Sequence, residues 1–144
     1  MKNLLPNLIQ EELEQERRSG ELQAGTLFMD ISGFTAMTER LMNEGKEGAE
    51  ILSGIINRLF APLIEAVYGR GGFVSGVAGD AFTAVFPGAN PVALLESAQD
   101  IQDVFAREGQ ASTRLGDFEL AVKVGLSAGR VEWGIVGESR LAYF

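Results

Sequence analysis

The sequence has 144 residues, contains neither Cys nor His, and carries a formal net charge of -8 at pH 7. Its length suits one domain with its own hydrophobic core. The missing residue types exclude disulfides, zinc–thiolate sites, His metal ligands and Ser–His catalytic triads. Any metal bound by side chains therefore needs oxygen ligands, which favours Mg²⁺, Mn²⁺ or Ca²⁺. The excess of acidic residues argues against nucleic acid as a partner.

The first twenty residues read as a lead-in to a domain over residues 21–144. Leu8–Arg18 is predicted to be a short, highly charged helix whose thin apolar stripe packs weakly on that domain. The segment has too many acidic residues and too short an apolar stretch for a signal peptide. No run of about 18 apolar residues occurs, so we expect no membrane span and a cytoplasmic location.

An apolar strand followed by two helices is predicted next. Leu22–Ile31 contains the run Leu27-Phe28-Met29, which is typical of a buried central strand. A helix is expected over Phe34–Asn43, and a turn at Glu44–Lys46 leads to a longer helix. Apolar pairs recur every four residues along that helix up to Val67. Pro62 within it predicts a kink or a local restart, and three glycines, Gly69, Gly71 and Gly72, mark its end.

The second half predicts a hairpin, a helix and two more strands. The strands Phe73–Ala78 and Ala81–Phe86 flank a two-residue turn, Gly79-Asp80, and Asn90-Pro91 is a typical helix start. The remaining expected elements are a polar loop over Gly109–Asp117, a strand over Leu120–Leu126 with one buried face, a turn at Gly129-Arg130, and a strand over Val131–Val136. This order predicts an α+β fold: a ferredoxin-like (βαββαβ) antiparallel sheet with helices on one face, plus an extra N-terminal helix.

Two aspartates are predicted to meet at one edge of this sheet. A right-handed crossover makes the first two strands parallel and leaves room for the third between them. The end of the first strand, with Asp30, and the hairpin turn, with Asp80, then lie at the same edge. Close carboxylates repel unless a cation lies between them. The alternative is that Asp30 only caps a turn and Asp80 only suits the backbone of another.

The residues after Asp30 favour a phosphate group. Ser32 and Gly33 precede a helix that starts at Phe34, and free amides at a helix N-terminus bind anions together with the helix dipole. A carboxylate at the strand end beside such amides suits a metal–phosphate complex.

Three segments resemble the catalytic domains of class III nucleotidyl (adenylyl/guanylyl) cyclases: FMDISGFT, FVSGVAGDAFTAVF and VGLSAGRVEWGIVG. The likeness runs from about Gly25 to the end, and is nearest to the first cyclase domain of soluble, bicarbonate-responsive adenylyl cyclases. It implies that Asp30, Asp80 and the Ile31 carbonyl bind two Mg²⁺ or Mn²⁺ ions. It also implies that the amides of Ser32, Gly33, Phe34 and Thr35 hold the phosphates of ATP, or of GTP. The implied reaction is attack of the ribose 3′-oxygen on the α-phosphorus, which expels pyrophosphate.

The departures from the family pattern suggest half of a shared active site. Family members that read adenine carry a Lys four residues before the second metal Asp, where this sequence has Gly76. The later base-reading and transition-state residues would lie beyond Phe144, so we expect the domain to be C-terminally incomplete. In this family each active site lies between two domains. We therefore expect a second cyclase domain in the same chain or a partner subunit, and negligible cyclase activity from the 144 residues alone.

Three other functions share some of these sequence features. A degenerate cyclase domain could sense a ligand or support dimerisation without catalysis, and Gly76 is its main argument. A phosphohydrolase with an aspartyl nucleophile usually needs an acid two residues further on, where Ser32 stands. A diguanylate cyclase needs acids after the Gly71-Gly72 pair, where Phe73 and Val74 stand, so that reading is rejected.

Overall fold

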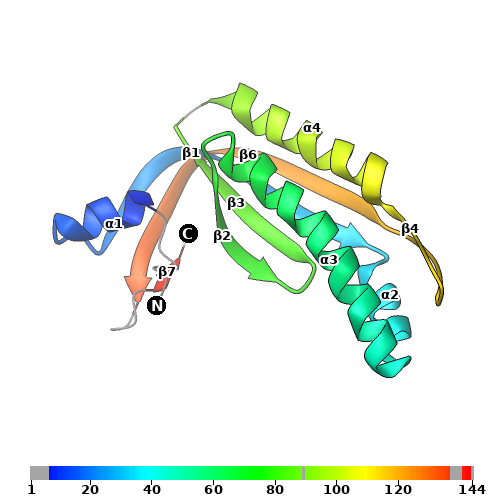
Figure 1. Ribbon diagram of the computed structural model, residues 1–144. Coiled ribbons are helices and arrows are strands. Elements are labelled where there is room, and N and C mark those ends of the chain that lie inside the picture. Colours follow the sequence, from blue (N-terminus) through cyan, green and yellow to red (C-terminus); the bar gives the residue numbers. More distant parts are fainter. Residues whose placement is uncertain (1–6, 89, 137–140, 144) are drawn as a thin grey trace.

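The computed structural model describes residues 7–88, 90–136 and 141–143. A five-stranded antiparallel sheet carries helices on one of its faces (Figure 1). The elements in chain order are α1 (Asn7–Glu14), β1 (Ser19–Ser32), α2 (Phe34–Met42), α3 (Gly45–Tyr68), β2 (Phe73–Ala78), β3 (Ala81–Pro87), α4 (Pro91–Glu108), β4 (Gln110–Thr113), β5 (Gly116–Glu119), β6 (Ala121–Val136) and β7 (Leu141–Tyr143).

The strand order confirms the predicted topology. The sheet runs β2-β3-β1-β6-β7, so β1 is the central strand. β3 pairs antiparallel with both β1 and β2, which makes β1 and β2 parallel with β3 between them. This is the ferredoxin-like arrangement expected from the element order.

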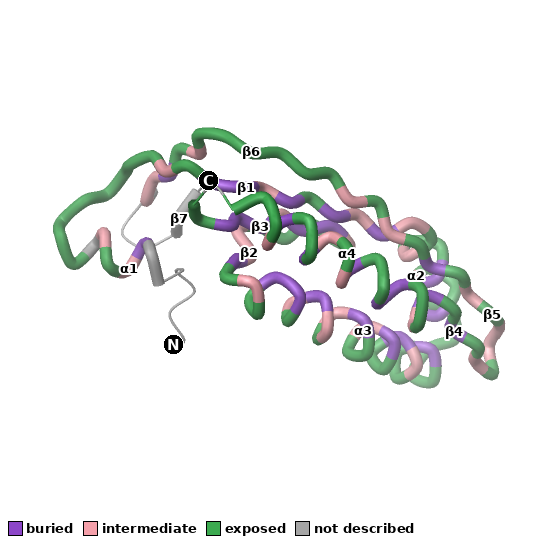
Figure 2. The backbone as a smooth tube through the Cα atoms, turned by 90° about the horizontal axis from the view of Figure 1, so that it is seen from above, coloured by how far each residue is buried: buried purple, intermediate pink, exposed green. Residues whose placement is uncertain are grey.

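The main core lies between the sheet and helices α2, α3 and α4. Alternate residues of β1, Leu27, Met29 and Ile31, are buried there because successive side chains of a strand point to opposite faces. Buried and exposed residues alternate along α3 and α4, as expected for helices with one face on a core (Figure 2). Phe28, predicted to be buried with its neighbours, is instead 51% exposed because it lies on the face opposite Leu27 and Met29.

Helix α3 is long and carries the apolar pairs that recur every four residues in the sequence. Its 24 residues are apolar enough to cross a membrane by length and composition. Its apolar stripe, however, contributes Leu52, Ile55, Leu59 and Leu63 to the core. The helix continues through Pro62 without the expected restart.

Two predictions in the second half were wrong. Residues 109–117 are not a loop, because Gln110–Thr113 and Gly116–Glu119 form a hairpin that buries Ala111. Its strands are four residues each and mostly polar, so they show no apolar alternation. β6 runs unbroken through Gly129, because the 14 residues of β1 pair with it along their whole length.

The N-terminal segment also packs more closely than predicted. β1 begins at Ser19, three residues earlier than expected, and Ser19 pairs with Gly134 on β6. In α1 the Ile9 side chain is completely buried. The segment is therefore attached to the sheet by strand pairing, and its helix contributes one fully buried apolar side chain.

Candidate active site

Asp30 lies near the end of β1 and faces away from the helices. Its neighbours Met29 and Ile31 are buried under the helix layer, so strand alternation places Asp30 on the opposite face. Across the strand pair on β6, the residue opposite Asp30 is Lys123. Within the described residues no ion pair or hydrogen bond involves the Asp30 carboxylate. A half-buried, unpaired carboxylate at a strand end is free to bind a cation.

The β2–β3 turn brings Asp80 next to Asp30. Gly79 has a φ of 64°, the left-handed conformation that a two-residue hairpin turn requires, and Asp80 completes the turn. Ala81, the residue after Asp80, pairs with Asp30. Paired Cα atoms in an antiparallel ladder are about 4.5–5.5 Å apart. The two aspartates therefore lie at one edge of the sheet on neighbouring strands, as predicted from the topology.

Gly33 forms the corner between β1 and α2. Its φ of 89° is strained for any residue with a side chain, and a Cβ there would lie 2.6 Å from the Glu119 carbonyl oxygen. Gly33 is the N-cap residue and offers no side-chain hydrogen bond to the helix. Gly33 therefore does not cap the first amides of α2. An anion could bind where the oxygen of a capping side chain would otherwise lie.

A cavity of about 480 Å³ joins Asp80 to the start of α2. Asp80 and Gly79 form one side, Phe34 and Thr35 of α2 form another, and the remaining lining residues are Thr38, Glu39, Ile56 and Phe60. Asp30 and Ser32 do not line it. The structure thus brings the second aspartate and two of the four predicted phosphate-binding residues to one cavity, and places the other aspartate on the adjacent strand.

The cavity also contains groups that the sequence did not single out. The Phe34 and Phe60 rings make an edge contact with centroids 6.4 Å apart, which gives the cavity an apolar wall. The Thr38 hydroxyl is buried and has no hydrogen-bond partner. Thr38 lies four residues after Phe34 and therefore on the same face of α2. That spacing is the sequence feature that could have indicated its place in the cavity.

Gly76 lies on the exposed part of β2, opposite Thr83 and after an irregularity in the pairing. A Cβ at Gly76 would meet no atom within 4 Å, and its φ is not positive. The fold therefore does not require glycine here, and a Cβ at this position would meet no steric obstacle.

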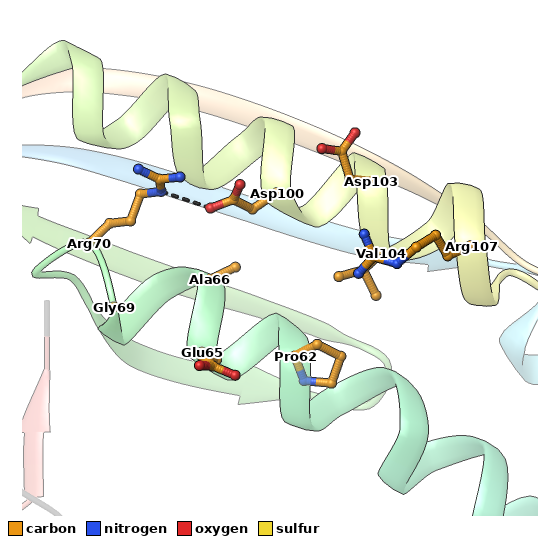
Figure 3. Close-up of a pocket in the computed structure, with 9 residues that line it drawn as sticks. All are labelled: Pro62, Glu65, Ala66, Gly69, Arg70, Asp100, Asp103, Val104 and Arg107. Atoms are coloured by element: carbon orange, nitrogen blue, oxygen red, sulfur yellow. Dashed lines mark hydrogen bonds and ion pairs between the residues drawn. The ribbon is translucent and has the colours of Figure 1, made fainter.

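A second cavity, of about 360 Å³, lies between α3 and α4 (Figure 3). Among its lining residues, Arg70 donates a hydrogen bond to Asp100 at 2.7 Å and forms an ion pair with Glu96. The hydrogen bond to Asp100 raises the pKa of Arg70 above its usual value. Because its guanidinium already joins the two helices, Arg70 acts as a structural tie.

Comparison with known proteins relates this chain to a family. No protein-family model matches the chain. Adenylate cyclase type 10 from mouse is 32% identical over 151 residues, which covers 97% of this chain and 9% of the relative. The rat protein gives the same identity and coverage. The aligned region includes the strand–turn–helix corner and hairpin described above. The chain belongs to the class III nucleotidyl cyclase family.

Solved structures show the same fold. A bacterial light-regulated adenylyl cyclase superposes with a TM-score of 0.71 at 23% identity, over 94% of this chain and 40% of that one. A dimeric guanylyl cyclase domain of the RhoGC fusion protein from the aquatic fungus Blastocladiella emersonii gives 0.58 at 20% identity, over 85% and 66%. The α+β architecture predicted from the sequence is thus the cyclase domain fold. The chain spans only 9% of the length of its mouse relative.

Proposed function

We propose that this domain supplies the metal-binding half of an active site that converts ATP to 3′,5′-cyclic AMP and pyrophosphate. One observation carries the proposal. Asp30 pairs with Ala81, the neighbour of Asp80, at the sheet edge where α2 begins. Homology to adenylate cyclases supports ATP as the substrate, with GTP as the alternative. We also propose a cytoplasmic location, because the proposed reaction uses ATP and Mg²⁺, which the cytoplasm supplies.

The residues present fit divalent cations. Asp30 and Asp80 provide carboxylates without protein partners among the described residues, and the Ile31 carbonyl is a third oxygen donor at the same strand end. The described residues contain no cluster of three acids that would form a complete cage. Two acids and a carbonyl suit Mg²⁺ or Mn²⁺, which retain water and substrate phosphates as ligands. Two bound ions would lower the pKa of the ribose 3′-hydroxyl and neutralise the leaving pyrophosphate.

The start of α2 orients the phosphates in this proposal. The backbone amides from Ser32 to Thr35 would hold the β- and γ-phosphates, supported by the helix dipole and by the absence of a capping side chain at Gly33. Fixing these groups places the α-phosphorus within reach of the 3′-oxygen. The contribution of this chain is therefore orientation and charge, which are the main terms in phosphoryl transfer.

A second cyclase domain, in the same chain or in a partner subunit, would complete the site. The sheet face that carries Asp30 also exposes Phe28 on the central strand, and β6 beside it is exposed along residues 125–130. Gly76 gives no side chain for reading a base. We propose that the second domain covers this face and supplies that group.

The test is cyclic nucleotide formation by the intact protein with Mn²⁺ and ATP, or with GTP. Asp30→Asn and Asp80→Asn should each lower turnover at least about 100-fold, since a metal ligand supports several kcal/mol of transition-state stabilisation. Asp103→Asn, an exposed aspartate on α4, is the matched control and should match the unaltered protein. Activity that survives both site substitutions would refute the proposal.

A degenerate, non-catalytic domain is the second candidate, favoured by Gly76. If this candidate is right, Asp30→Asn and Asp80→Asn leave the cyclase activity of the intact protein unchanged. Binding of a nucleotide analogue that requires Mn²⁺ and is lost when Asp80 is replaced would count against this candidate.

A further inference from the structure

The β4–β5 hairpin contacts both ends of α2. At the start of the helix, the Glu119 carbonyl oxygen occupies the space that a Cβ at Gly33 would need. At its end, the Arg40 guanidinium lies over the Phe118 ring, 5.7 Å from Cζ to the ring centroid. The same guanidinium lies close to Gly116, where an added Cβ would be 2.9 Å from its Nη2 atom. Arg40 thus fits between an aromatic face and a glycine.

We propose that Arg40 and Phe118 are positioning residues that fix the orientation of α2, and with it the phosphate-binding amides at its start. This inference rests on the proposed function. α2 has only nine residues, so a small rotation at its last turn moves its first turn as well. Its buried residues, Met37 and Leu41, attach it to the core along one side only. The hairpin provides the second support.

The hairpin is itself firmly held. The Thr113 hydroxyl donates to the Gly116 carbonyl at 2.8 Å and accepts from the Leu115 amide at 3.1 Å, which closes the turn. At the other end, the Leu120 amide donates to the Gly109 carbonyl at 2.8 Å. Ala111, on β4, is buried in the core. Because both ends of the hairpin are fixed, its contacts with α2 restrict the orientation of that helix.

The size and kind of effect follow from the contact. An exposed cation–π contact is worth about 0.5–1 kcal/mol, which corresponds to roughly two- to fivefold in binding. Phosphate contacts persist from the bound substrate to the transition state, so their misplacement raises KM more than it lowers kcat. A merely structural contact would lower the melting temperature and leave the KM of the folded molecules unchanged.

The experiment measures Mn²⁺-dependent binding of a non-hydrolysable ATP analogue, with KM and kcat, in the intact protein. Arg40→Ala and Phe118→Leu should each weaken binding two- to fivefold and raise KM, whereas Arg40→Lys, which keeps a cation over the ring, should restore most of the loss. The double variant should lose no more than either single one, because both remove one contact. Arg107→Ala removes the basic residue of the last turn of α4 and is the matched control for loss of charge at a helix end.

The outcomes separate the two proposals. If analogue binding depends on Asp80 but Arg40→Ala and Phe118→Leu bind as tightly as the unaltered protein, the positioning role is overturned and the proposed function stands. Additive losses in the double variant would also overturn it. If no Asp80-dependent binding exists, the proposed function fails and the positioning role fails with it.

Discussion

Single residues at the β1–α2 corner and at the β2–β3 turn carry the chemistry of the proposed site. Gly33 combines a φ of 89° with a carbonyl oxygen 2.6 Å from where its Cβ would be. Asp30 and Asp80 have no partners among the described residues, so their charges are available to a cation. Two neighbouring carboxylates without partners repel each other, and a cation bound between them would remove that repulsion.

Gly33→Ala should destabilise the fold by at least about 1 kcal/mol, because the left-handed conformation alone costs about 1–2 kcal/mol for a residue with a Cβ. The clash with Glu119 adds to this. Urea denaturation of the variant gives the free energy of unfolding. Gly76→Ala is the control: its Cβ meets no atom within 4 Å, so it should be neutral or stabilising by up to about 1 kcal/mol. Equal effects of the two substitutions would contradict the role of Gly33.

The placement of Asp30 and Asp80 on neighbouring strands could be predicted from the sequence, but the cavity beside them could not. Asp30 and Asp80 were recognisable because a turn and a strand end mark them, and the strand order then brings them together. The cavity wall made by Phe60 and Thr38 could not be predicted, since it depends on how α3 packs against α2. The apolar periodicity identifies which face of a helix is buried, but not which side chains of two helices meet.

At the scale of elements, the predictions succeed where local signals are strong. The cap of α4 is such a case: the Asn90 side chain accepts hydrogen bonds from the amides of Val92 and Ala93, at 3.1 and 3.3 Å. Pro91 at the first helical position adds to the signal. The predictions fail where pairing is non-local. Gly129 reads as a break in the sequence, yet it stays extended because Ala24 on β1 lies opposite.

Asn90→Ala should lower the free energy of unfolding by about 1 kcal/mol, the usual loss when an N-cap side chain is removed. The reason is that two helix amides lose their acceptor. Thermal or urea unfolding of the purified protein checks it. Ser53→Ala, on the exposed side of α3, removes a hydroxyl that caps no helix and should change stability little. A loss no larger than that of the control would show that the cap does not hold α4.

For the whole molecule, the element order was enough to predict the sheet topology and the helix layer. Strong turns and two periodic helices leave few ways to connect the strands. The missing part of the prediction, the β4–β5 hairpin, is the element that supports α2 at both ends. Its short polar strands show no apolar alternation, so the sequence did not predict this element, to which we assign a functional role.

We propose for the molecule as a whole that Asp30 and Asp80 together bind the divalent ions of a nucleotide cyclase site. The most direct measurement is anomalous scattering from crystals of the intact protein grown with Mn²⁺ and a non-hydrolysable ATP analogue. We expect manganese peaks in contact with both carboxylates and with the Ile31 carbonyl, and the analogue's phosphates at the start of α2. Bound analogue with no manganese at either aspartate would contradict the account.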